Sequence, residues 1–306
     1  MMRKGWYCPM RMNPVYKREV MVSARSFRLG LILLVFNGIL ALVALLNMYS
    51  TLAQVRVTAE IQYTSFMDLY LFVAILEFVM LIFIMPSITA GSISGERERQ
   101  TLELMLTTQM TPLQIVLGKL AASMSTMLLM MVSSFPIVSM VFVYGGVTMR
   151  DLAVLLLCFT VAALFVGSLG ICCSALFRKS TIATAVTYGL MGIIVLGTFG
   201  INQFALYWQE IHTGQYLQVL NPSAGTVTSG NFLWLLLINP ATTFLSAMMR
   251  MTGSGRSVAR TVHWFGNHRM EIMHGSWIGI SMAVQLLMAA IFLILAVRAV
   301  SSGKQS

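Results

Sequence analysis

The stretch LGLILLVFNGILALVALLNMY, residues 29–49, decides the fold class, and the whole run 29–55 carries no charged residue. A helix that crosses a membrane needs about 20 predominantly apolar residues, and this run is long enough to cross once. Comparable apolar runs recur along the chain. The sequence predicts six transmembrane spans, at about 29–50, 67–88, 113–144, 151–177, 181–205 and 277–298.

The composition of all 306 residues agrees with this interpretation. Hydrophobic residues make up 58% of the chain and charged residues only 10%, whereas soluble domains carry about 25% charged residues. This balance excludes a soluble enzyme, a disordered chain and a secreted disulfide scaffold. The predicted fold class is therefore an all-α polytopic membrane protein.

The positive charges predict the orientation. With the N-terminus inside, the inner segments hold 14 Lys and Arg residues and the outer segments hold 6, in agreement with the positive-inside rule. Both termini are therefore expected in the cytoplasm, including the short tail 301–306. The net charge of +10 lies at the ends of apolar runs, so we expect a lipid bilayer and no nucleic acid as partner.

Residues 1–28 are the predicted cytoplasmic N-terminus, with a basic amphipathic helix that lies along the headgroups. Asn13 is placed to cap this helix, and Pro14 suits its first position. The expected apolar face holds Tyr16, Val20, Ala24 and Phe27, and the expected cationic side holds Lys17, Arg18, Arg25 and Arg28. A frayed basic tail is the alternative.

Residues 206–276 form a predicted outer region. This region contains one further apolar stretch, 232–249, in addition to the six predicted spans. Asn239-Pro240 interrupts this stretch, because proline removes a backbone hydrogen bond and disfavours helix just before it. We predict a re-entrant segment, and a seventh span is the alternative. His263, His268 and His274 match no metal-ligand spacing, so no metal or cofactor is expected in this chain.

Residues 86–120 read PSITAGSISGERERQTLELMLTTQMTPLQIVLGKL. The densest charge cluster of the chain lies here, on a predicted cytoplasmic loop, and comprises Glu96, Arg97, Glu98, Arg99 and Glu103. Leu102, Met105 and Leu106 give a short apolar stripe at helical spacing. We predict a short amphipathic helix at about 94–108 that docks a soluble partner, and a solvated linker helix is the alternative.

This region is similar to the signature region of ABC type-2 transporter permeases. The matching residues are Gly95, Glu96, Arg97, Glu98, Arg99, Thr101, Leu102, Glu103, Pro112, Gly118, Lys119 and Leu120. MNPVYKREV at 12–20 and LINPATTFLSAM at 237–248 extend the resemblance over most of the chain.

The resemblance implies the permease subunit of an ATP-driven exporter in the plasma membrane of a prokaryote. Two copies of an ABC ATPase and a second permease, identical or different, would complete the transporter. The sequence has no GxxxxGK[ST] phosphate loop, so ATP and Mg are expected in the partner ATPase. The implied coupling residues are Gly95, Glu96, Arg97, Glu98, Arg99, Thr101, Leu102, Glu103 and Met105. A membrane-embedded enzyme and a non-transporting scaffold or sensor are the alternatives.

Glu77 lies near the middle of the second predicted span. Insertion scales assign a cost of about 2.5–3.5 kcal/mol to an acid at a helix centre, and no other span carries a charge near its middle to pair with it. Glu77 is therefore expected to face protein or water, or to be protonated. It is either a contact on the translocation path or between permeases, or a neutral, hydrogen-bonded interior acid.

Overall fold

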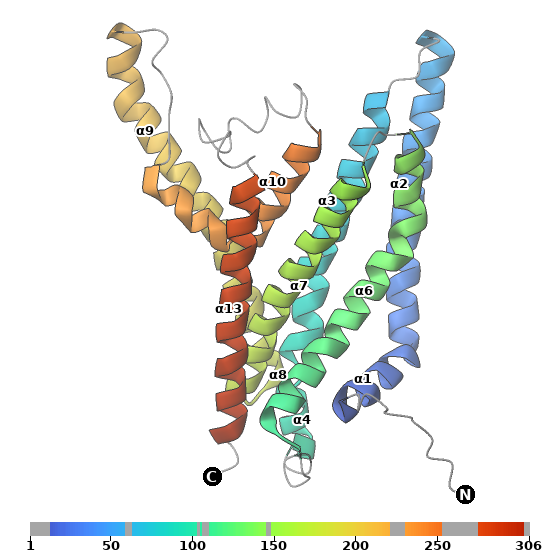
Figure 1. Cartoon of the computed structure of the whole chain (residues 1–306), viewed down its shortest axis with the longest axis vertical. Helices are drawn as coiled ribbons and strands as arrows, with labels where there is room; N and C mark the ends of the chain where they lie inside the picture. The colour runs from blue at the N-terminus through green and yellow to red at the C-terminus, as the bar shows by residue number, and fades with distance from the viewer. Residues whose placement is uncertain are drawn as a thin grey trace, which may run out of the picture.

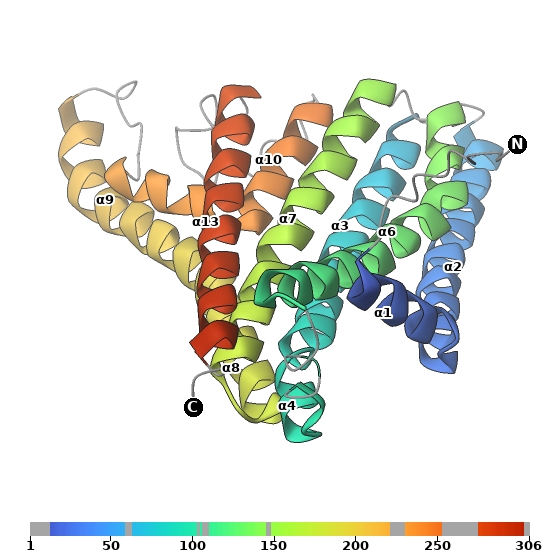
Figure 2. The ribbon, with the colours of Figure 1, turned by 60° about the horizontal axis from the view of Figure 1, so that its bottom comes forward.

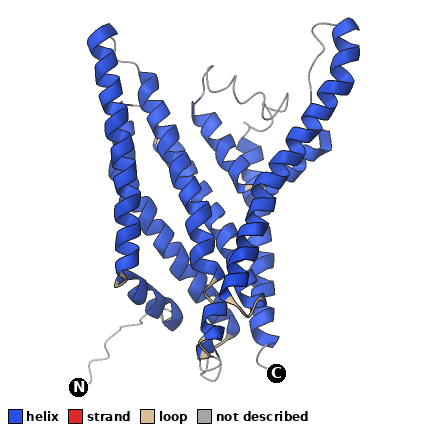
Figure 3. Ribbon diagram, turned by 180° about the vertical axis from the view of Figure 1, so that it is seen from behind, coloured by secondary structure: helices blue, strands red, loops and turns tan. Residues whose placement is uncertain are grey.

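Every described element of the chain is a helix. The computed structural model describes residues 13–58, 63–102, 105, 110–144, 148–220, 230–252 and 275–302. The elements are α1 (Pro14–Ala24), α2 (Phe27–Thr58), α3 (Tyr63–Ala90), α4 (Ser94–Glu98), α6 (Pro112–Tyr144), α7 (Met149–Leu176), α8 (Ser180–Gly192), the π-helix η1 (Ile193–Gly197), α9 (Thr198–Leu220), the 3-10 helix η2 (Gly230–Ile238), α10 (Pro240–Thr252) and α13 (Gly275–Ser302) (Figures 1 and 3).

Six helical stretches among the described residues are long and apolar enough to cross a membrane. They are Leu29–Ser50, Tyr70–Glu98, Pro112–Pro136, Met149–Leu176, Ser180–Gln209 and Ser276–Ser301. The fifth stretch runs from α8 into α9 through the π-helical turn η1. The predicted all-α polytopic class with six spans is confirmed.

Helix α7 is the centre of the bundle and packs against α3, α6, α8, α10 and α13 (Figure 1). In the fourth span, which α7 forms, 67% of the most apolar 18-residue segment is buried within the protein. The corresponding share in the first span is 11%. Apolar side chains gain little from leaving lipid, so close packing holds such helices together. A stack of Phe78, Phe159 and Phe244 joins α3, α7 and α10, with ring centroids of Phe78 and Phe244 4.4 Å apart.

The N-terminal helix α1 lies across the end of α6 (Figure 2). Its predicted cap is confirmed, because Asn13 Oδ1 accepts a hydrogen bond from Val15 N at 3.1 Å and Pro14 begins the helix. Val15 of α1 is buried within the protein, whereas Phe27, a member of the predicted apolar face, starts α2 and is 84% exposed. Gly118 of α6 makes the contact possible, since a Cβ there would lie 2.9 Å from the Val15 Cβ.

The interrupted stretch before the last span forms a sharply bent pair of helices. Asn231–Ile238 and Pro240–Met251 meet at an angle of 98°, at the proline that the sequence marks as a break. The end of α10, the end of α9 and the start of α13 lie toward the same end of the bundle (Figure 1). This arrangement favours the re-entrant segment over a seventh span. Residues 221–229 and 253–274, which include His263, His268 and His274, lie outside the described residues.

Asn239 fixes this bend with both ends of its side-chain amide. Its Oδ1 accepts from Ala241 N at 2.9 Å and so caps α10. Its Nδ2 donates to Val195 O at 3.0 Å, within η1, and to Thr198 Oγ1 at 2.8 Å. The π-helical turn of the fifth span therefore offers a carbonyl oxygen to the bend, and the two irregular elements support each other.

The substitution Asn239→Ala is expected to lower the free energy of unfolding by about 1–3 kcal/mol, because it leaves buried donors and acceptors without partners. Asn239 is 1% exposed. The matched control is Asn231→Ala at the exposed start of η2, which should change stability little. Thermal denaturation of the purified protein in detergent measures both, and equal denaturation midpoints for the two variants would contradict the assignment.

Candidate functional site

The charged segment after α3 folds at the same end of the bundle as α1 and the start of α8 (Figure 1). The predicted continuous helix at 94–108 is not observed in the described part of that segment. Helix α4 ends at Glu98, Gln100 adopts a positive φ of 57°, and helical geometry resumes at residues 101–102. A side chain with positive φ is disfavoured inside an α-helix, so Gln100 divides the segment. Glu103 and residues 106–109 lie outside the described residues.

The start of α4 is held by a serine of α7. Ser174 Oγ accepts hydrogen bonds from Ile93 N at 2.8 Å and from Ser94 N at 2.9 Å. These are amide groups at a helix start, which have no partner within the helix. Ile93, Ser94 and Ser174 are each 0% exposed, so the backbone of α4 is anchored to the central helix of the bundle.

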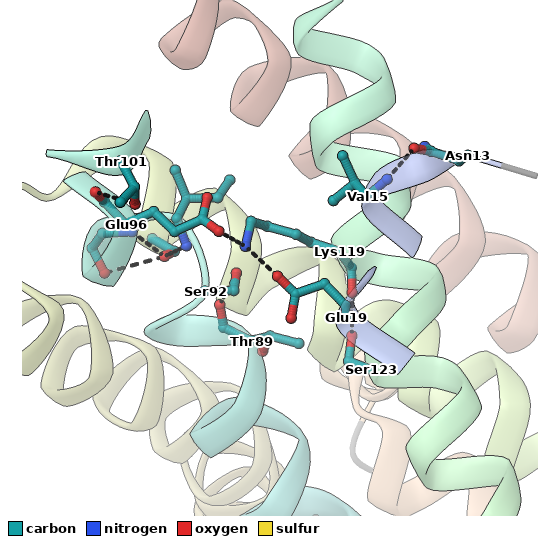
Figure 4. Close-up of polar contacts among 12 residues, drawn as sticks. Asn13, Val15, Glu19, Thr89, Ser92, Glu96, Thr101, Lys119 and Ser123 are labelled. Carbon is teal, nitrogen blue, oxygen red and sulfur yellow. Dashed lines mark hydrogen bonds and ion pairs between the residues drawn. The ribbon is translucent and has the colours of Figure 1, made fainter. Parts of the chain in front are cut away.

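Three charged side chains, Glu19, Glu96 and Lys119, form an ion triad beside α4 (Figure 4). The Lys119 Nζ lies 3.1 Å from Glu19 Oε1 and 3.0 Å from Glu96 Oε1. The Lys119 side chain is only 4% exposed, and that of Glu96 is 15% exposed. The buried Lys119 cation of α6 therefore joins α1 and α4. Because a buried charge is costly without a partner, the two carboxylates stabilise it.

The end of α4 is attached to α8 by Glu98. One carboxylate oxygen accepts from Ser180 N at 2.9 Å, and the other accepts from Ser180 Oγ at 2.9 Å. Lys179, at the N-cap of α8, makes no side-chain capping hydrogen bond. Glu98 thus supplies the negative charge and the acceptor that the start of α8 favours.

Two of the predicted acids, Glu96 and Glu98, therefore bind other helices, and neighbouring side chains remain at the surface. Glu98, Arg99 and Gln100 are exposed, and Arg97 is half-buried. The exposed surface of the segment therefore carries the Arg99 cation next to the Glu98 carboxylate, which is already hydrogen-bonded to Ser180. Gly95 has no neighbour within 4 Å of where a Cβ would stand.

The apolar residues after the Gln100 turn face the bundle. Leu102 is buried in a cluster with Val15, Ile93, Ile115 and Ile171. Met105 packs against the same cluster. Leu102 and Met105, the described members of the predicted apolar stripe, therefore secure this part of the segment to α1, α6 and α7.

A cleft of about 470 Å³ opens between α1, the end of α3, α4 and α6. Thr101 lines it together with Arg18 and Arg99, and the ion triad forms part of its wall. Thr101 Oγ1 also donates to Glu96 O at 3.1 Å. The hydrogen bond links the residue after the Gln100 turn back to α4, so the turn and the helix form one structural unit.

The sequence did not indicate that Glu19, Ser174 and Ser180 belong to this site. Glu19 was part of the basic N-terminal helix, and the serines lie in or next to apolar runs. The one available signal was Lys119, a lone cation at the start of a predicted span within the matching region. A buried cation requires acids nearby, which the charge cluster at 96–103 could have supplied.

Glu77 lies inside the bundle, as expected of an acid within a span. Its Oε1 is buried without a hydrogen-bond partner, and its side chain forms a hydrogen bond with Ser134 of α6. The ion triad lies at the α4 end of the same bundle, so Glu77 is not part of the site around α4. The ion triad and Glu77 therefore need separate explanations.

A search of curated proteins finds no match to this chain. The family model described as ABC-2 family transporter protein matches residues 46–298. The match contains α4, Ser174, Ser180 and two members of the ion triad, and it includes the bent pair before the last span. Glu19 and helix α1 precede the match. Because the match covers well over half of its 306 residues, this multi-pass membrane chain belongs to the ABC-2 transporter family, whose permeases are non-catalytic transmembrane components that work with an ABC ATPase.

Proposed function

We propose that this chain is the permease subunit of an ATP-driven exporter and that the α4 segment receives conformational drive from the ATPase. The observation that carries the proposal is the attachment of α4. Ser174 anchors its start to α7, Glu96 joins it through Lys119 to α6 and α1, and Glu98 joins it to α8. A force on the surface of α4 would therefore move four helices together.

The exposed side of the segment suits a partner with acidic groups. The acids next to Arg97 and Arg99 in sequence are already engaged, since Glu96 binds Lys119 and Glu98 binds Ser180. Cations on a surface favour a partner of opposite potential and raise its association rate. The ATPase, which would bind ATP and Mg, is expected to offer an acidic or polar cleft to this surface.

A complete transporter would contain two ATPase copies and a second permease, identical or different. The first and fifth spans support this assembly, since only 11% and 17% of their most apolar 18-residue segments are buried within the chain. Their outer faces are available to lipid and to another permease. The inner segments hold more Lys and Arg residues than the outer segments, which supports a plasma-membrane location with both termini in the cytoplasm. The same excess supports a cytoplasmic position for α4, on the side of the membrane where ATP is present.

We expect an ABC ATPase to copurify with the wild-type chain, and we expect the double substitution Arg97→Glu and Arg99→Glu to release it. Removal of a charged side chain that matters at an interface costs about 1 kcal/mol or more, so recovery of the ATPase should fall at least about tenfold for the pair. Neither Glu96 nor Glu98 is changed, because both hold the fold of the segment. Affinity purification followed by quantification of the ATPase band provides the measurement.

The matched control is Arg150→Glu, which reverses an exposed charge near the capped start of α7, on the opposite end of the bundle (Figure 1). This variant should retain the ATPase. Size-exclusion chromatography checks that every variant is folded. Full retention of the ATPase by the Arg97 and Arg99 variant would assign the segment another task, as in a scaffold or sensor.

A further inference from the structure

We propose that Glu77 and four methionines form an intramembrane binding site for one soft monovalent cation, Cu(I). The site is a small cavity of about 10 Å³ between α2, α3, α6 and α7. Its lining consists of Phe36, Glu77, Met80, Leu81, Met127, Met130, Met131 and Phe159. The inference goes beyond the proposed coupling role of α4 and does not depend on it.

The methionines reach the cavity through helical spacing. Met127, Met130 and Met131 are related by three and four residues on α6, so they share one face of that helix. Met80 follows Glu77 by three residues on α3 and shares its face in the same way. Met127 and Met130 are 3% and 4% exposed, so their thioethers are held inside the protein.

The carboxylate of Glu77 lacks the partners that a buried acid needs. Its Oε1 has no hydrogen-bond partner, and its side chain forms a hydrogen bond with Ser134. The hydroxyl of Ser134 has a single proton, and Met131 O, which accepts from Ser134 Oγ at 2.8 Å, competes with Glu77 for that proton. None of the residues that line the cavity is basic, so the lining leaves a role for a bound cation.

The donor set selects the kind of cation. Thioether sulfur is a soft ligand that favours Cu(I), whereas Mg²⁺ and Ca²⁺ require about six or more oxygen ligands. Zn²⁺ sites are built from Cys, His, Asp and Glu. Among the described residues, no three such side chains lie close enough together to bind a metal ion. One carboxylate, that of Glu77, neutralises one positive charge, which favours a monovalent ion.

The size of the cavity agrees with a single ion. A cavity of about 10–15 Å³ holds one water-sized particle, and the Glu77 cavity has a volume of about 10 Å³. A bare monovalent ion fits, whereas an organic molecule does not. A single trapped water molecule is the competing occupant, and a binding measurement distinguishes the two.

The test titrates the purified full-length chain with Cu(I) under anaerobic reducing conditions, in competition with a chromogenic Cu(I) chelator. One Cu(I) per chain is expected, with sulfur and oxygen or nitrogen neighbours in X-ray absorption. Ag(I), a soft ion that does not change oxidation state here, should compete for the same site. Failure of the chain to retain Cu(I) against the chelator at micromolar concentration would overturn the proposal and leave water as the occupant.

Variants assign the binding to this cavity. Glu77→Gln and the pair Met127→Leu with Met130→Leu should each weaken Cu(I) binding at least about tenfold. Met80→Leu with Met131→Leu, which changes the half-buried members, serves as a second pair in case the first does not fold. Leucine is close to methionine in volume, so size-exclusion profiles should remain those of the wild type.

Two controls exclude other ligands. Met249→Leu with Met282→Leu changes buried methionines that belong to other clusters and should leave binding unchanged. Cys172→Ala with Cys173→Ala removes two adjacent buried thiols, which are alternative soft ligands in the bundle, and should also leave binding unchanged. Loss of Cu(I) in the cysteine pair, or wild-type affinity in the Glu77 and methionine variants, would refute the site.

Discussion

Lys119→Met is expected to destabilise the α4 end of the bundle more than any other single change of charge. It leaves the Glu19 and Glu96 carboxylates without the cation that each contacts within 3.1 Å. Removal of one partner of a buried ion pair costs about 3–5 kcal/mol. We expect the lower end of this range, because the Glu19 side chain is 31% exposed and is partly screened by water.

The measurement is thermal denaturation in detergent, read together with ATPase recovery. The control is Lys179→Met, which removes an exposed lysine and should change the denaturation midpoint little. Addition of Glu96→Gln to Lys119→Met should restore part of the stability, because it removes one of the two stranded charges. A midpoint for Lys119→Met equal to that of Lys179→Met would show that the triad does not hold α4.

The fold class was predictable because the membrane limits the choice of structure. Backbone groups cannot remain unpaired in hydrocarbon, so a long apolar run must be a helix. The break at Asn239-Pro240 was predictable for a similar local reason, since proline cannot continue the preceding hydrogen-bond pattern. Both predictions depend on residues that are adjacent in sequence.

The interactions of the α4 segment were only partly predictable. The charge cluster marked the right segment, but it gave no sign that Glu96 and Glu98 bind other helices while Arg99 stays exposed. The ion triad joins residues 19, 96 and 119, and a pairing over such distances depends on how α1 lies across α6. The division of the helix at Gln100 was also missed, because glutamine is an ordinary helix former.

Gly170→Ala is expected to destabilise the contact between α7 and α3 next to α4. A Cβ at this position would overlap Thr89 Oγ1 and would lie 2.9 Å from Thr89 Cβ. Thr89 cannot easily move away, since it is 1% exposed and its hydroxyl donates to Met85 O at 2.8 Å. Its branched side chain also has few rotamers in a helix. Overpacking of this kind costs about 1–3 kcal/mol.

The comparison with Gly189→Ala makes the Gly170 prediction specific. Both glycines lie within α-helices, but a Cβ on Gly189 meets nothing within 4 Å. An alanine favours the helix by about 1 kcal/mol relative to a glycine. Gly189→Ala should therefore be neutral or stabilising, whereas Gly170→Ala should lower the denaturation midpoint.

Thr89 stands one residue before Ala90, whose carbonyl accepts from Ser94 Oγ at 3.2 Å, so a displaced α3 would also disturb α4. Gly170→Ala should therefore reduce ATPase recovery together with stability, and reduced stability with full recovery would separate the α3–α7 packing from coupling.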